Sequence, residues 1–155
     1  MNRTRIFLVV FACALLQVSV MDAVRVFGVK PDLLVIAVVI ASLECERGFA
    51  LLAALFCGLL KDTLSVTPFG LHTFLFPVMS MLIIFTARKI TLDSTALASI
   101  TSFFFIIVYD VASRAAYALL GQSISIPAYL RISSLQALYT AAVFPLVSRL
   151  IKKLL

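Results

Sequence analysis

Two short apolar runs and the polar break between them decide the fold, and they lie in residues 31–62, PDLLVIAVVIASLECERGFALLAALFCGLLKD. The runs cover 33–43 and 49–60, and neither contains a charged residue. Pro31 suits the start of a helix. The pattern predicts two short membrane helices joined by a tight polar turn. Such helices either use their polar flanks as caps and snorkelling groups or pair in a locally thinned bilayer.

The composition of the whole chain extends this prediction to a single membrane domain. Of 155 residues, 63% are hydrophobic and 13% charged, whereas soluble domains have about 45–50% and about 25%. At about 20 residues per span, six spans leave no room for a soluble catalytic or DNA-binding module, and no nucleic-acid partner is expected. We therefore predict an all-α integral membrane protein, one domain over 1–155. The apolar runs are 6–21, 33–43, 49–60, 71–87, 95–120 and 133–150.

The distribution of basic residues predicts the orientation in the membrane. The net charge is +6, and the basic residues stand singly or in pairs at the edges of the apolar runs. With six spans and an inner N-terminus, eight basic residues fall on the inner side and four on the outer side. Lysine and arginine accumulate in cytoplasmic loops, so both termini should be cytoplasmic. The first run is then an uncleaved helix rather than a secretory signal.

Small residues recur every four positions on the third predicted helix. Ala50, Ala54 and Gly58 form a stripe that ends at Asp62. Such stripes allow a neighbouring backbone to approach closely, so the stripe is interpreted as a helix-packing face. The alternative makes Asp62 a partner or ligand contact. Leucine at Gly58 should destabilise the protein, whereas Val39, expected to face lipid, should accept leucine.

Two ionisable residues lie inside the fifth predicted helix. Asp110 and Arg114 are one helical turn apart with the acid first, the better orientation for a salt bridge within a helix. Alternatively, Arg114 extends to the outer surface and Asp110 finds Tyr109, Tyr117 or another helix. A role in proton-coupled transport is a further alternative, since ionisable residues at this depth are often functional.

No catalytic motif or metal-ligand spacing is recognisable in the chain. His72 is the single histidine, and together with Asp62 it offers fewer ligands than a zinc site needs. The three cysteines are an odd number and predict no disulfide framework. We therefore expect no enzyme activity, no cofactor and no metal.

Several short motifs follow one another along the chain. They are Pro31-Asp32, Gly58-x-x-x-Asp62-x-x-Ser65, Pro68-x-Gly70-Leu71-His72, Asp110 and Phe144-Pro145 before the basic end. The most specific part is the turn between the third and fourth helices, which contains Pro68, Gly70 and His72. The order and spacing of these motifs resemble the bacterial rod-shape-determining MreD family over nearly the whole chain.

The resemblance implies a multi-pass inner-membrane protein of the cell-elongation complex without catalysis of its own. Its partners would be the scaffold MreC and, through it, the actin-like MreB and a glycosyltransferase–transpeptidase pair that makes peptidoglycan. The family is also similar in architecture to the substrate-binding S components of energy-coupling-factor transporters. A transporter subunit with a pocket near the turn and Asp110 is therefore the second hypothesis.

Overall fold

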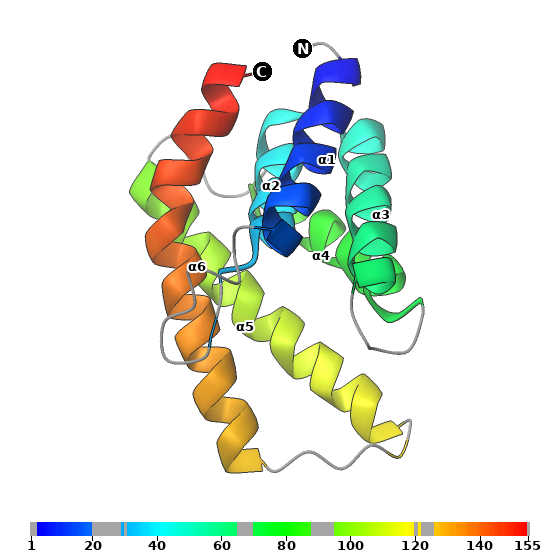
Figure 1. Cartoon of the computed structure of the whole chain (residues 1–155), viewed down its shortest axis with the longest axis vertical. Helices are drawn as coiled ribbons and strands as arrows, with labels where there is room; N and C mark the ends of the chain where they lie inside the picture. Colours follow the sequence, from blue (N-terminus) through cyan, green and yellow to red (C-terminus); the bar gives the residue numbers. More distant parts are fainter. Residues whose placement is uncertain are drawn as a thin grey trace.

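The computed structural model describes residues 3–19, 29, 31–64, 70–87, 95–119, 121 and 126–154. Within these residues every regular element is a helix, as the composition predicted. The six helices are α1 (Arg3–Ser19), α2 (Leu33–Glu44), α3 (Arg47–Leu64), α4 (Leu71–Ala87), α5 (Thr95–Leu119) and α6 (Ile126–Leu154). The start of α1 and the end of α6 lie at the same end of the molecule (Figure 1).

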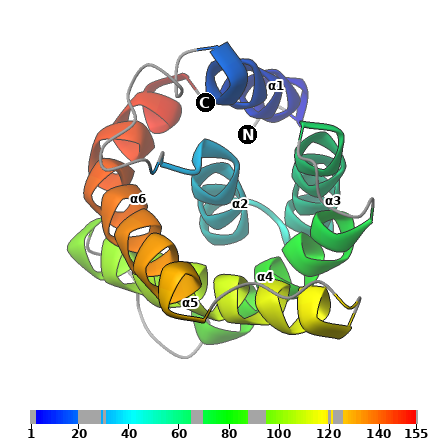
Figure 2. The same ribbon diagram turned by 60° about the horizontal axis from the view of Figure 1, so that its bottom comes forward.

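The short helix α2 is the centre of the bundle. The other helices surround it in the order α1, α3, α4, α5, α6, and each of them contacts it (Figure 2). Every residue from Leu33 to Ser42 is buried. A helix that is apolar on all sides suits such an enclosed position.

The expectation that Val39 faces lipid was therefore wrong, because its side chain is only 1% exposed. Lipid tails are as apolar as a protein core. Hydropathy alone does not distinguish a helix at the centre of a bundle from one at its surface.

The predicted helix boundaries agree best with the observed ones where the sequence contains a clear turn signal. The predicted fourth helix, 71–87, has the observed bounds of α4. In contrast, α6 begins at Ile126 rather than at residue 133, since Pro127 lies in its first turn, where proline is well tolerated. Pro31 precedes α2, and Asp32 is the N-cap.

The outer surface of the bundle is apolar, and the helices differ in length. Among the described residues, one stretch, Leu130–Ile151 of α6, is both long and apolar enough to cross a bilayer. Leu8–Gln17, Leu33–Glu44 and Leu71–Ala87 are shorter apolar helices. The number of membrane spans therefore stays a prediction.

Candidate functional site

The N-terminus of α2 is the meeting point of a polar cluster inside the bundle. Asp32 caps α2, because its Oδ1 accepts a hydrogen bond from the backbone N–H of Val35 at 3.2 Å. The backbone N–H of Asp32 donates to Oγ1 of Thr140 on α6, also at 3.2 Å. Both Asp32 and Thr140 are buried. The first turn of the central helix is thus tied to the last helix of the chain.

Helix α1 supplies an amide to the same point. Nε2 of Gln17 donates to the carbonyl of Pro31 at 3.2 Å, and its Oε1 accepts from the backbone N–H of Leu33 at 2.8 Å. One side chain therefore satisfies a donor and an acceptor of the backbone where α2 begins. Backbone groups at a helix N-terminus otherwise lack partners within the helix.

Lys61 of α3 is the cation of the cluster. Its Nζ forms a salt bridge with Oδ2 of Asp32, and it lies 4.9 Å from the ring centre of Tyr109 and 5.3 Å from that of Phe76. Contacts of a cation with aromatic rings at this range are stabilising. The lysine therefore has both a charge partner and an aromatic surrounding.

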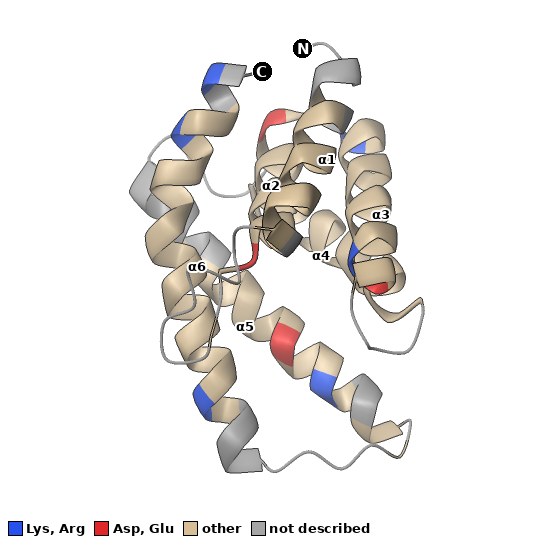
Figure 3. Cartoon of the chain, viewed as in Figure 1, with Lys and Arg blue, Asp and Glu red and all other residues tan. Residues whose placement is uncertain are grey.

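Tyr109 of α5 connects this pair to α4. Its hydroxyl forms a 2.7 Å hydrogen bond with Nδ1 of His72, and both side chains are buried. The six residues Gln17, Asp32, Lys61, His72, Tyr109 and Thr140, one from each helix or its cap, are called here the polar ring. Figure 3 shows that charged residues are sparse along the helices around it.

Asp62 points away from Lys61 and caps α4. Its carboxylate accepts hydrogen bonds from the backbone N–H groups of Gly70, His72 and Thr73, at 2.9 to 3.0 Å. The Thr73 hydroxyl donates to it at 2.5 Å. Gly70 has a φ of 100°, which favours glycine. This carboxylate thus connects the end of α3 to the start of α4. Pro68, which was predicted to lie in the turn between them, is outside the described residues.

The small-residue stripe lies inside the bundle, above this cap. Ala50 and Ala54 are fully buried. A Cβ atom added to Gly58 would lie 2.5 Å from the carbonyl oxygen of His72 and 2.6 Å from Cα of Thr73. The backbones of α3 and α4 therefore meet at Gly58 with no room for a side chain.

Asp110 makes a contact between α5 and α6. The hydroxyl of Ser133 donates to its Oδ2 at 2.5 Å, and the carboxylate is buried. Arg114 is half-buried one turn later. Pairing of Asp110 with Arg114 stays a prediction.

Sequence reasoning missed the connections within the polar ring. The basic residues were expected at the edges of the apolar runs, whereas the structure places Lys61 beside Asp32, with a side chain only 18% exposed. Gln17 and Thr140 were not predicted as site residues, although each is a polar residue within an apolar run. Such a residue indicates a polar contact inside the bundle, but the sequence does not identify the partner, which lies on another helix.

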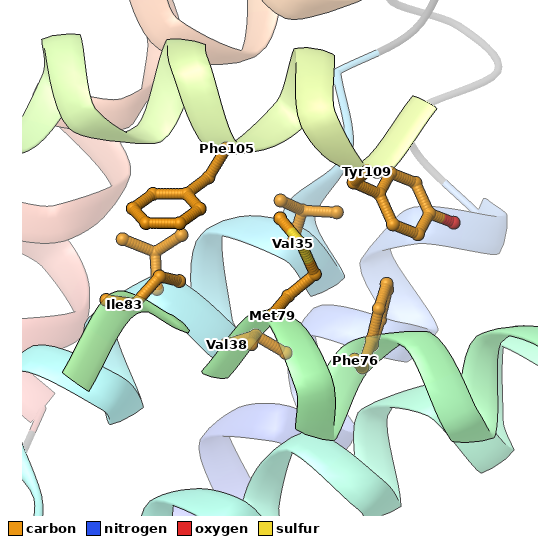
Figure 4. Close-up of a pocket in the computed structure, with 8 residues that line it drawn as sticks. Val35, Val38, Phe76, Met79, Ile83, Phe105 and Tyr109 are labelled. Atoms are coloured by element: carbon orange, nitrogen blue, oxygen red, sulfur yellow. The ribbon is translucent and has the colours of Figure 1, made fainter. Parts of the chain in front are cut away.

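A small apolar cavity adjoins the polar ring between α2, α4 and α5 (Figure 4). Its volume is about 10 Å³ and it is lined by aliphatic and aromatic side chains, with Phe76 and Tyr109 at the end nearest the ring. In the described part of the chain no three histidine, cysteine or acidic side chains come together as metal ligands. The polar groups that do meet form hydrogen bonds and an ion pair with one another.

Helices with apolar outer faces, held together by an internal polar ring, define a helical membrane protein whose core chemistry is contact between helices. The chain belongs to the MreD family: the family model, described as rod shape-determining protein MreD, matches residues 2–154. The family is a membrane-protein family with a role in rod-shape determination. No curated protein and no solved structure matches the chain.

Proposed function

We propose that this protein is a non-enzymatic scaffold of the cell-elongation complex in the bacterial inner membrane. In this role it binds MreC and, through MreC, organises MreB and a glycosyltransferase–transpeptidase pair. The observation that carries the proposal is the polar ring, in which buried and partly buried polar side chains bond across helices. Groups engaged in this way stabilise a defined outer surface, which is what a scaffold presents to partners.

The orientation is part of the proposal. Six spans with both termini in the cytoplasm agree with the common end of the first and last helices in Figure 1. They also agree with the eight-to-four distribution of basic residues. Reporter domains fused after Lys89 and after Ser123 should report the cytoplasmic and the outer side, respectively. The same side for both fusions would contradict the six-span topology.

Co-purification tests the partner. The protein is extracted from membranes in mild detergent, and the proteins that accompany it are identified. Recovery of MreC, together with restored rod shape in a host that lacks the native protein, supports the scaffold. A transporter ATPase in place of MreC would favour the transporter subunit and refute the scaffold.

A matched pair of variants separates a folding defect from a binding defect. Lys61→Met breaks the ion pair with Asp32 inside the bundle, whereas Leu146→Ala changes a side chain that is 65% exposed on α6. The first should lower stability and partner recovery together. The second should leave stability unchanged, so that any loss of MreC it causes identifies a contact face.

A further inference from the structure

The polar ring marks one common level across the bundle, against which each helix can be measured. Hydrogen bonds and the ion pair place Gln17 of α1, Lys61 of α3 and Thr140 of α6 beside the start of α2. His72 of α4 lies at this level too, bonded to Tyr109 of α5. The distance from this level to each helix end follows from a rise of about 1.5 Å per residue.

On the side of the ring that holds the two chain ends, the helices have similar lengths. Arg3 to Gln17 of α1, Arg47 to Lys61 of α3 and Thr140 to Leu154 of α6 each rise about 21 Å. Helix α2 rises about 18 Å on this side. On the same side α4 rises about 22 Å from His72 to Ala87, and α5 rises about 21 Å from Thr95 to Tyr109. All six helices thus share a layer about 20 Å thick.

On the other side, α5 and α6 are the helices that continue within the described residues. Helix α1 ends at Ser19, α3 ends at Leu64 and α4 begins at Leu71, all within about one turn of the ring. Helix α5 continues from Tyr109 for about 15 Å and α6 from Thr140 for about 21 Å. Figure 1 shows these two helices extending beyond the others.

The bands of exposed apolar side chains differ in length in the same way as the helices. On α6 they continue from Leu130 to Leu150, which is about 30 Å, the thickness of a typical hydrocarbon core. On α3 they continue from Leu52 to Leu64, which is about 18 Å. The face formed by α1, α3 and α4 therefore has a shorter apolar band than the face formed by α5 and α6.

Charged residues follow α1 closely in the sequence. Asp22, Arg25 and Lys30 come between α1 and α2, and charged side chains are costly within hydrocarbon. A hydrocarbon layer of full thickness on the short face would extend beyond the ends of α1 and α3. A short hydrophobic length is instead matched by thinning of the bilayer.

We propose that this protein holds the bilayer at two thicknesses, about 30 Å along α5 and α6 and about 20 Å along α1, α3 and α4. The partner of the face formed by α1, α3 and α4 is the lipid bilayer itself. Beside this face the bilayer is thinner, because the headgroups of its outer leaflet lie at the level of the polar ring. Water and lipid headgroups then reach the ends of α1 and α3, while the same level on α6 stays within hydrocarbon.

Two positions at the same level of the protein test the proposed difference in bilayer thickness. Leu64 on α3 is 47% exposed and lies just beyond Lys61, and Leu138 on α6 is 57% exposed and lies just beyond Thr140. The chain contains no tryptophan, so Leu64→Trp and Leu138→Trp each introduce a single fluorophore. Each variant is reconstituted in dioleoyl phosphatidylcholine vesicles with phospholipids brominated near the headgroup or near the chain end.

Quenching by shallow bromines should exceed quenching by deep bromines for Leu64→Trp, and the ratio should be reversed for Leu138→Trp. Leu52→Trp and Leu150→Trp are the matched controls, because both exposed positions lie far from the ring on the other side. These two should have equal depths, whereas tilting of the whole protein would separate them as well.

Three results would overturn the proposal. The first is that the tryptophans at positions 64 and 138 have the same depth in the bilayer. The second is that the tryptophans of the control pair differ in depth as much as those at positions 64 and 138 do. The third is that lipid bromines do not quench Leu64→Trp. Each variant must keep the unfolding temperature of the wild type in detergent. If Leu64→Trp does not, Thr63→Trp, at an exposed neighbouring position, replaces it under the same criteria.

Discussion

The contact at Gly58 supports a quantitative prediction for a change of one methyl group. In Gly58→Ala the new Cβ would lie 2.5 Å from the His72 carbonyl oxygen and 2.8 Å from its carbonyl carbon. Ordinary contacts begin at 3.4 Å, so α3 and α4 must separate by about 1 Å in a densely packed interior. Both neighbouring atoms belong to the backbone and cannot rotate away.

The expected cost of Gly58→Ala is about 1–3 kcal/mol of the free energy of unfolding, as for other overpacked sites. Gly58→Leu should cost more. The measurement is thermal unfolding of the purified protein in mild detergent, together with recovery of MreC in the same preparation. We expect the unfolding temperature to fall and the yield of the complex to fall with it.

Gly48→Ala is the matched control on the same helix. A Cβ at Gly48 meets nothing within 4 Å, and alanine is a better helix former than glycine by up to about 1 kcal/mol. This variant should be neutral or slightly more stable. If Gly58→Ala and Gly48→Ala change the unfolding temperature equally, α3 and α4 do not approach closely at Gly58 and the reasoning fails.

Three further predictions concern the buried polar contacts. Lys61→Met leaves the Asp32 carboxylate buried without its cation and should lower the free energy of unfolding by about 3 kcal/mol. The double variant Lys61→Met, Asp32→Asn should recover part of this loss. Additive losses of the two single variants would contradict the ion pair. Thr140→Val removes the acceptor for the Asp32 N–H and should cost about 1–3 kcal/mol, whereas Thr140→Ser should stay close to the wild type in the same unfolding assay. Asp110→Asn keeps an acceptor for Ser133 and should preserve rod shape better than Asp110→Ala, which a neutral residue at Arg114 should partly rescue; equal losses without rescue would favour coupled transport.

The sequence predicted local features better than the arrangement of the helices. The bounds of α4 follow from a clear turn before Leu71 and an unbroken apolar run. The all-helical class follows from composition. The central position of α2 was not predicted, because an apolar run suits both lipid and protein. The start of α6 was misplaced at residue 133, because the first turn of the helix, which contains Pro127, precedes the apolar run.

The candidate site likewise contains local contacts that the sequence indicated and distant contacts that it did not. Asp62, Gly70 and His72 are close in sequence, and local turn chemistry brought them into consideration together. The pairing of Asp32 with Lys61 joins residues 29 positions apart. Contacts of this kind depend on how helices pack, which a single sequence does not encode in any local pattern.

The central position of α2 has a consequence for the biogenesis of the protein. The hydroxyl group that accepts the N–H of Asp32 belongs to Thr140, which follows 108 residues later in the chain. Gln17, Asp32 and Lys61 can meet as soon as α3 has been made, whereas the N–H of Asp32 obtains its acceptor only after α6 has been made. The last contact of the polar ring therefore forms at the end of synthesis, when α6 packs against the start of α2.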